Sequence, residues 1–268
     1  MSNYTYQRTS RAHNRAQKYD SEFRNYSNLD KDNIKLGHYV SETDISIRMA
    51  FVRKVYSILT LQLIGTVISS YLVTYSYAVK FFFQTNPGLL LFTIALGFIS
   101  LMALNYKAKS YPLNVILLSI FTLSESVLLG CIVSISHSTA VLQALILTLG
   151  IFIGLTVFTM QSKYDFSQIG PILALSAWGL LILSSVQMFI PFSSSNELKI
   201  SVFAVFLFSG YIMYDTHMIM NRYTPDDYII ASVSLYLDVI NLFIRILDIL
   251  DKESRRNKNR RRAEQDSE

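Results

Sequence analysis

Seven apolar stretches, each long enough to cross a bilayer as a helix, limit what this chain can fold into. They lie at about 54–76, 87–106, 112–135, 139–161, 168–190, 199–220 and 228–250. A spanning helix needs ~20 mostly apolar residues, because in lipid the backbone polar groups must bond within the segment itself. With 51% hydrophobic and only 16% charged residues, the chain is also too apolar for an ordinary soluble domain. We therefore predict an all-α integral membrane protein, a bundle of seven transmembrane helices.

The apolar stretches divide the chain into three parts. Residues 1–44 are rich in Asn, Ser, Tyr and Arg and lack apolar periodicity, so we expect a disordered hydrophilic tail. The seven-helix membrane domain is expected at 45–250, and residues 251–268 form a basic C-terminal tail. The first apolar run starts near Val55 and is a full bilayer wide, which argues against a cleaved signal peptide.

The formal net charge of +5 raises the question of a nucleic-acid partner. The basic residues sit in tails beside apolar spans, and no RNA- or DNA-binding motif accompanies them. We therefore expect no nucleic acid, and anionic lipid headgroups are the favoured counterpart. The single cysteine, Cys131, excludes an intrachain disulfide and a cysteine-based metal site.

Lys and Arg near the ends of the spans predict the orientation, because cytoplasmic loops carry an excess of both. The ends expected in the cytoplasm carry Arg48, Arg53, Lys54, Lys107, Lys109, Lys163 and Arg222. The opposite loops carry only Lys80 and Lys199, so the N-terminus is expected inside. Seven crossings would then place the basic C-terminal tail outside, against the same rule. Either the last segment enters and returns, or the basic tail is carried across.

Asp215 and Asp238 are the central candidates for a functional site. An ionised Asp at mid-bilayer costs ~2.5–3.5 kcal/mol, so such a residue normally faces a protein interior or water and has a function. Asp215 lies ~10 Å inside the cytoplasmic end of its span, and Asp238 lies ~16 Å inside the same face. Because the two spans are adjacent and antiparallel, side chains and tilt can close the difference. We expect the two carboxyl groups to meet.

Two carboxyl groups in contact in a low dielectric do not easily both ionise, so the pair would share a proton and act as a proton sensor. Loss of that proton would be relieved by moving a helix or by binding a cation. Ca²⁺ prefers oxygen ligands, which makes Asp215 and Asp238 candidates for transient Ca²⁺ binding. Asn241 follows on the same helical face as Asp238 and could supply an amide oxygen. The alternative is that local hydroxyl and backbone groups satisfy each Asp separately.

Three further features carry weaker hypotheses. Glu125 lies mid-span between two serines and could line the same ion path, or it could be a protonated Glu bonded across helices. Gly150 and Gly154 form a small-xxx-small pattern, which favours close packing within the chain over dimerisation. His217 lies beside Asp215, although a lone His near an interface is more often a packing residue.

The segment MYDTHMIMNRYTPDDYIIASVSLYLDVINLFIRIL resembles the C-terminal signature of the transmembrane Bax inhibitor motif family, also called Lifeguard-like proteins. RMAFVRKVYSILTLQLIGT in the first span and NVILLSIFTLSESVLLG in the third support the resemblance, which covers residues 48–250. It implies a seven-helix bundle with the last helix central, Ca²⁺ leak from internal stores, and a link to calcium homeostasis and suppression of cell death. It also implies no cofactor other than calcium as the permeant ion.

The resemblance assigns roles to individual residues. Asp215 in YDT and Asp238 in LYLDVIN match the paired aspartates proposed to sense pH and gate the path. Some members latch this pair with a basic residue from the cytoplasmic end of the second span, where this chain has Lys107 and Lys109 and no Arg. The endoplasmic reticulum is the expected membrane, with Golgi or vacuole as alternatives. Other membrane proteins of cell-death or stress pathways are expected as partners, besides calcium ions, protons and the bilayer.

Three other function classes compete with a leak channel. An intramembrane aspartyl protease also uses two aspartates in neighbouring spans, but it needs a Gly-rich turn before the second, and no glycine lies near Asp238. A seven-helix receptor would have its N-terminus outside, against the Lys and Arg bias. The stronger alternative is a non-conducting membrane scaffold that regulates apoptosis and stress signalling. We expect no enzymatic activity.

Overall fold

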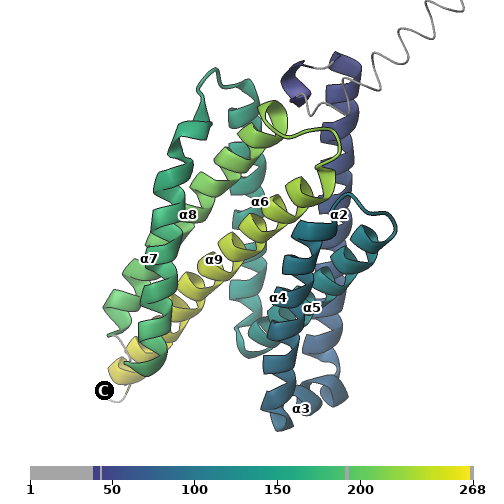
Figure 1. Ribbon diagram of the computed structural model, residues 1–268. Helices are drawn as coiled ribbons and strands as arrows, with labels where there is room; N and C mark the ends of the chain where they lie inside the picture. Colours follow the sequence, from purple (N-terminus) through teal and green to yellow (C-terminus); the bar gives the residue numbers. More distant parts are fainter. Residues whose placement is uncertain (1–38, 43, 191–192, 266–268) are drawn as a thin grey trace, which may run out of the picture.

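The computed structural model describes residues 39–42, 44–190 and 193–265, and these fold into a bundle of helices (Figure 1). Among the described residues, seven helices are long and apolar enough to cross a membrane, which confirms the predicted fold class. They are α2 (Ile45–Tyr75), α4 (Pro87–Lys107), α5 (Leu113–Ile135), α6 (Ser138–Gln161), α7 (Gly170–Phe189), α8 (Ser194–Asn221) and α9 (Tyr228–Gln265). Three short elements join them: η1 (Val40–Glu42), α3 (Tyr77–Thr85) and η2 (Phe166–Ile169).

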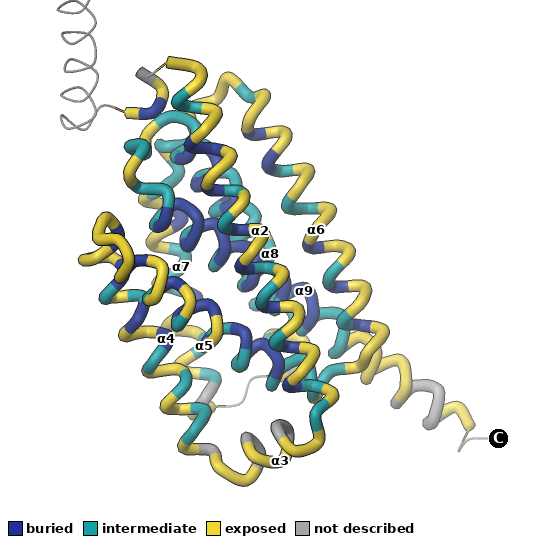
Figure 2. Tube along the Cα trace, turned by 90° about the vertical axis from the view of Figure 1, so that its right-hand side faces the viewer, coloured by how far each residue is buried: buried dark blue, intermediate teal, exposed yellow. Residues whose placement is uncertain are grey.

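The outer faces of the helices are apolar, as lipid requires. For example, the side chains of Leu61, Phe92 and Leu175 are 70%, 63% and 74% exposed. In Figure 2 the buried segments lie inside the bundle and exposed positions follow the outward faces. A soluble protein would not present so much contiguous apolar surface to water. The chain is therefore an integral membrane protein.

The bundle has two groups of helices with α9 between them. On one side, α5 packs against α2 and α4. On the other side, α6 and α7 each pack against α8. The last helix, α9, packs against α2, α5, α6 and α8. Figure 1 shows α9 running obliquely across the bundle between the two groups. Two thirds (67%) of its most apolar 18-residue window is buried, against 6–33% for the other six spanning helices. By this measure α9 is the most enclosed of the seven spanning helices, and its central position stays a prediction.

One continuous helix, α9, runs from Tyr228 to Gln265 and does not turn back. Its length of 38 residues corresponds to ~57 Å, more than the hydrocarbon core of a bilayer. The start of α2 and the end of α9 lie at opposite ends of the bundle (Figure 1). Of the two alternatives for the last segment, the structure favours a full crossing. The described part of the basic tail, residues 251–265, is the end of this helix.

The chain just before α2 is tied to the bundle. Residues 1–38 of the expected N-terminal tail lie outside the described residues. Within η1, the Val40 side chain is fully buried, and its backbone N–H donates to the Tyr223 carbonyl oxygen at 2.9 Å. The Ser41 hydroxyl donates to the Asn221 carbonyl oxygen, also at 2.9 Å. This short element therefore contacts the α8–α9 connection, at the end of the bundle expected in the cytoplasm.

The expectation that Gly150 and Gly154 allow close packing within the chain is wrong. A Cβ atom added at either position would meet nothing within 4 Å, because both glycines face outward from α6. Close packing instead occurs at Gly130 of α5, where an added Cβ would lie 2.7 Å from Val73 Cβ and 3.1 Å from Ser70 Cα of α2. The sequence pattern identified small residues but could not identify the side of the helix on which they lie.

We expect Gly130→Ala to destabilise the protein by about 1–3 kcal/mol, because the added methyl group forces α2 and α5 apart. Its melting temperature in detergent should fall below that of the wild type. Gly150→Ala is the matched control: it adds the same methyl group to an open helix position, where alanine is favoured over glycine by ~0.5–1 kcal/mol. Equal melting temperatures for the two variants would contradict this packing.

Candidate functional site

Asp215 of α8 and Asp238 of α9 lie together in the interior of the bundle. Their exposed fractions are only 7% and 6%, and their side chains are within hydrogen-bonding contact of each other. Asp215 lies six residues before the end of α8, and Asp238 lies ten residues after the start of α9, depths of ~9 and ~15 Å. The two helices are antiparallel neighbours, and the ~6 Å difference in depth is within the reach of side chains and helix tilt. The structure thus brings the two predicted aspartates together.

The pair has few other partners. Two carboxylates cannot donate to one another, so a hydrogen bond between them requires a proton on one of the two groups. Oδ2 of Asp238 is buried and has no hydrogen-bond partner among the described residues. No Lys or Arg of the described chain forms an ion pair with either aspartate. A second negative charge here would therefore be left without a compensating cation.

Tyrosines surround the aspartate pair. The phenol of Tyr211 lies within electrostatic range of both carboxyl groups, and that of Tyr223 lies within range of Asp215. Tyr223 is in the α8–α9 connection, where burial, with the nearby Asp215 carboxyl adding to it, raises the pKa of its phenol above the ordinary value. It therefore stays a neutral hydrogen-bond donor. Tyr214 points away toward the start of α7, where a Cβ on Gly170 would lie 2.8 Å from its ring.

Glu125 does not join the aspartate pair. It lies within electrostatic range of Tyr236 of α9, and its Oε1 would be 3.5 Å from a Cβ added at Gly97 of α4. Tyr236 and Asp238 are two residues apart, about 200° around the helix, so they face different sides of α9. The Tyr236 hydroxyl is 2.8 Å from Oγ1 of Thr66, and Ser126 Oγ donates to that same oxygen. Glu125 thus belongs to a second polar cluster, between α9 and the α2–α4–α5 group.

Asn241 is half-buried and its amide is engaged within its own helix. Nδ2 donates to the Leu237 carbonyl oxygen at 2.8 Å. No hydrogen bond of the described residues joins Asn241 to Asp215 or Asp238. The position one turn after Asp238 still places Asn241 along the same face of α9, as the sequence predicted.

Neither lysine proposed as a latch reaches the aspartate pair. Lys107 is exposed in the last turn of α4. Lys109 forms an ion pair with Asp227, Nζ to Oδ1 at 3.1 Å, directly before the first residue of α9. Asp227 is ~16 Å along α9 from Asp238, farther than a lysine side chain extends. Lys109 therefore binds the residue directly before α9 and not the aspartate pair.

Residues of α2 and of the chain after α4 contact the start of α9. Asp227 accepts hydrogen bonds from the Thr224 backbone and hydroxyl. Burial alone would raise the pKa of Asp227, but the hydrogen bonds from Thr224 and Lys109 outweigh it and hold the pKa below its ordinary value. Lys54 of α2 places its Nζ 3.2 Å from the centre of the Tyr228 ring, a cation–π contact. The first turn of α9 is thus anchored to α2 and to the chain after α4.

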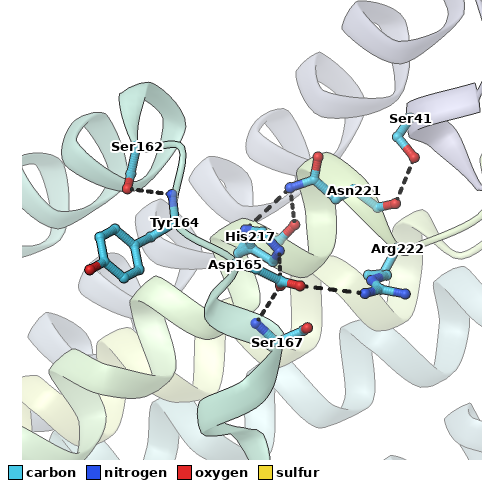
Figure 3. Close-up of polar contacts among 8 residues, drawn as sticks. All are labelled: Ser41, Ser162, Tyr164, Asp165, Ser167, His217, Asn221 and Arg222. Carbon is cyan, nitrogen blue, oxygen red and sulfur yellow. Dashed lines mark hydrogen bonds and ion pairs between the residues drawn. The ribbon is translucent and has the colours of Figure 1, made fainter.

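A polar cluster around His217 holds the α6–α7 connection against the end of α8 (Figure 3). His217 Nε2 lies 2.9 Å from Asp165 Oδ1, and Arg222 lies 3.8 Å from the other carboxylate oxygen. His217 Nδ1 is 3.2 Å from Nδ2 of Asn221, so Nδ1 accepts and Nε2–H donates to Asp165. Hydrogen bonds from the hydroxyl and backbone N–H of Ser167, together with the Arg222 charge, hold the pKa of Asp165 below its ordinary value. His217, expected to be a packing residue, is a bonded member of this cluster.

The other end of the α8–α9 pair is tied by a second ion-pair cluster. Lys252 of α9 binds Asp248 on its own helix at 2.8 Å and Glu197 of α8 at 3.3 Å. Ser201 of α8 donates a hydrogen bond to Asp248. Contacts at both ends therefore flank the aspartate pair in the middle.

Metal binding at the site would rest on the aspartate pair alone. Among the described residues, no group of three or more His, Cys, Asp and Glu side chains could hold a metal ion. The two carboxyl groups of Asp215 and Asp238 offer up to four oxygens, and any further ligands would have to be hydroxyl, carbonyl or water oxygens. The arrangement suits a weakly held oxygen-loving cation better than a resident metal.

Asp165, Asp227 and Lys54 are the polar residues around the site that the sequence reasoning missed. Asp227 lies in the TPDDY segment directly before an apolar helical run, where an acidic residue signals a helix start. The partners of Asp165 and Lys54 lie 52 and 174 residues away in the chain, and no local pattern indicates them.

Comparison with known proteins gives a consistent result. A sequence model of the family described as "Inhibitor of apoptosis-promoting Bax1" matches residues 48–256. Protein lifeguard 4 of Mus musculus is 41% identical over 222 residues, covering 82% of this chain and 92% of the relative. Bax inhibitor 1 of Schizosaccharomyces pombe is 41% identical over 211 residues, 79% of each chain.

A third relative is viral. The Golgi anti-apoptotic protein of vaccinia virus strain Lister is 37% identical over 226 residues, covering 84% of this chain and 95% of the viral protein. The region matched by the family model contains the aspartate pair and five whole spanning helices, with α2 from residue 48 onward and α9 up to residue 256. The chain belongs to the Bax inhibitor family, together with the Lifeguard proteins.

Proposed function

We propose that this protein is a pH-sensitive calcium leak channel of intracellular membranes, linked to calcium homeostasis and suppression of cell death. The observation that carries the proposal is the contact between two buried carboxyl groups, Asp215 and Asp238, in the middle of a membrane domain. Acidic groups at this depth are costly, and in membrane proteins they normally mark ion or proton pathways.

The pair responds to pH through its shared proton. When Asp215 and Asp238 share one proton, a hydrogen bond holds α8 against α9. When that proton leaves, two negative charges face each other, and at 4 Å with an effective dielectric of ~20 they repel by ~4 kcal/mol. This exceeds the few kcal/mol that separate the states of a typical conformational equilibrium and corresponds to roughly a thousandfold shift. Rising pH therefore favours separation of the two helices.

Calcium is the proposed permeant ion because it can relieve the same repulsion. Ca²⁺ takes six to eight oxygen ligands at about 2.3–2.6 Å, and the ionised pair would supply the acidic ones. No third acidic ligand adjoins them among the described residues. Two carboxylates alone bind weakly, and conduction needs a site that releases its ion as readily as it binds it. No resident cofactor and no catalysis form part of this proposal.

The anchored ends of α8 and α9 direct the movement to the middle of the pair. The Lys109–Asp227 and His217–Asp165 contacts hold one end, and Lys252 with Glu197 holds the other. Separation of the charged carboxyl groups would then bend or rotate the helices at mid-bundle, with the ends fixed. Glu125 and Asn241, predicted along the ion path, are secondary candidates to line it.

The cellular setting is proposed from the relatives. The names of the yeast and viral relatives refer to inhibition of Bax and to anti-apoptotic action, and the viral name adds the Golgi. We propose that this protein resides in an internal membrane, the endoplasmic reticulum first and Golgi or vacuole as alternatives, and that lowering the stored Ca²⁺ is its route to suppressing cell death. Other membrane proteins of death or stress pathways are its proposed partners. A non-conducting scaffold is the alternative that direct flux measurement excludes or supports.

The first prediction concerns flux. Purified protein in liposomes should release Ca²⁺, and the rate should rise as the pH increases over about pH 5–8 because the pair loses its proton. In Asp215→Asn and Asp238→Asn, a single carboxyl group remains without a like-charged partner. Flux should then vary with pH no more than about twofold, while the wild type varies by about tenfold or more.

Two controls sharpen this measurement. His217→Gln removes the imidazole two residues from Asp215 and should keep the wild-type pH dependence; its loss would assign the sensor to His217. Glu125→Gln removes the carboxyl group near Tyr236, on another side of α9, and should also keep the wild-type pH dependence. Wild-type flux equal to that of empty liposomes would refute the channel and favour the scaffold.

The second prediction concerns the Lys109–Asp227 contact. The Lys109 side chain is 60% exposed, and such ion pairs contribute ~0.2–1 kcal/mol. Lys109→Gln should therefore raise flux by at most about fivefold, by releasing the start of α9. Lys107→Gln removes the same charge from an exposed neighbour and should leave flux unchanged. The exchange Lys109→Asp with Asp227→Lys should restore the wild-type rate.

The sign of the pH effect separates this contact from the pair. Because the pKa of Asp227 lies below its ordinary value, the contribution of the ion pair is present above that ordinary value and is lost only as pH falls through the lowered pKa. The contact is therefore constant over about pH 5–8. A Lys109→Gln variant that lost its pH dependence in this range would contradict the assignment of the sensor to Asp215 and Asp238.

A further inference from the structure

A cavity of about 580 Å³ opens on the side of the bundle between α2 and α6. Both helices pack against α9, but they do not form a packed pair with each other among the described residues. Val239, Ile240 and Phe243 of α9 form the floor, and α5 closes one side with Leu129 and Val133. The cavity lies at the end of the bundle where α2 ends and α6 begins, opposite to the end expected in the cytoplasm.

The cavity extends over the depth of one lipid leaflet. On α2 its lining runs from Leu63 to Tyr75, and on α6 from Ser138 to Leu149. These stretches rise ~18 and ~16 Å along their helices. The hydrocarbon core of a bilayer is ~30 Å thick, so one leaflet contributes ~15 Å. The groove therefore has the length of one extended lipid tail, and its volume is in the range of small-molecule pockets, ~300–1,000 Å³.

The walls of the groove offer apolar contacts and few free polar groups. Thr66 is bonded to the Tyr236 hydroxyl, and Ser70 donates to the Ser126 carbonyl oxygen. Ser136 donates to the Ile132 carbonyl oxygen. These hydroxyl groups are already satisfied. Thr148 of α6 is an exception, because its Oγ1 is buried without a hydrogen-bond partner among the described residues. The wall chemistry favours a hydrocarbon chain.

The mouth of the groove differs from its walls. Its lining there includes Ser138 at the first residue of α6 and Tyr75 at the last residue of α2. The Tyr75 ring packs on that of Tyr71 with centroids 4.5 Å apart, and both are more than half exposed. Tyrosines at this level are typical of the membrane interface, where headgroups lie. The groove thus has a polar end and an apolar interior, like the lipid leaflet beside it.

We propose that this groove is a binding site for one acyl chain of a phospholipid in the leaflet at the α5–α6 end. The chain fills the space between α2 and α6, contacts the α9 floor, and leaves its headgroup at the mouth. Dispersion contacts with the lining side chains hold it, as direct helix packing would if the two helices touched. Neither Asp215 nor Asp238 is a lining residue of this groove.

The test uses full-length protein in liposomes with a phosphatidylcholine that carries a photoactivatable diazirine near the end of one acyl chain. After illumination, labelled residues are mapped by mass spectrometry as the fraction of probe increases. We expect labelling of the α2, α5 and α6 lining to saturate at one chain per protein and to fall when unlabelled phosphatidylcholine competes. Labelling of the outward face of α7 should rise in proportion to the probe.

Two substitutions test the position of the site. Leu145→Trp fills the groove from α6, and Val67→Trp fills it from the rim of α2, where the side chain is 53% exposed and the core is untouched. Each should lower the saturable labelling by about tenfold or more, since displacing two methylene groups already weakens binding about tenfold. Leu181→Trp on α7, 59% exposed outside the groove, is the matched control and should change nothing. Melting temperatures verify that the variants are folded.

Three results would overturn the proposal. Labelling of the lining that never saturates would mean ordinary contact with bulk lipid. Saturable labelling that Val67→Trp leaves unchanged would place the chain elsewhere. Competition by cholesterol but not by phosphatidylcholine would make the occupant a sterol.

Discussion

The architecture depends on one costly contact, between two carboxyl groups buried inside a membrane domain. Asp215 and Asp238 are more than nine-tenths buried and lie against each other, and no Lys or Arg of the described residues forms an ion pair with them. Lipid does not solvate such groups, so the surrounding helices must enclose them. The burial of α9, the most enclosed of the spanning helices, supplies that enclosure. We propose that the contact is stable only while one proton is shared, which would make the packing of α8 on α9 sensitive to pH.

The polar contacts at the ends of α8 and α9 differ in role from the aspartate pair between them. Polar clusters hold both ends of the α8–α9 pair, and they involve groups such as Asp165, Asp227 and Lys252. The depressed pKa values of Asp165 and Asp227 keep these ends charged at neutral pH. Among the described residues, the central pair brings two acidic groups together without a basic partner. In the proposed mechanism, a change of protonation there acts on two helices whose ends are held, which would localise the response to the middle of the bundle.

The sequence predicted the features that lipid dictates and missed those that depend on helix rotation. The spans agreed within a few residues, apart from longer α2, α8 and α9, because a bilayer requires a long apolar run whatever the tertiary structure. The contact of Asp215 with Asp238 followed from depth in two adjacent helices. Glu125 was grouped with that pair from its mid-span position and Lys109 from the family resemblance, but Glu125 faces another side of α9 and Lys109 pairs with Asp227. Packing angles, which no local pattern encodes, decide such partners.

The central claim is that the two aspartates share a proton, and infrared difference spectroscopy of the protein in liposomes tests it most directly. The carbonyl stretching band of a protonated carboxyl group shifts when water is exchanged for D₂O, and its loss with rising pH can be followed beside calcium flux. The account predicts a band that disappears over the pH range in which flux rises, that is changed in both Asp215→Asn and Asp238→Asn, and that persists in Glu125→Gln. A wild-type protein without a protonated carboxyl group in that range, or a band that both aspartate variants retain unchanged, would contradict the account.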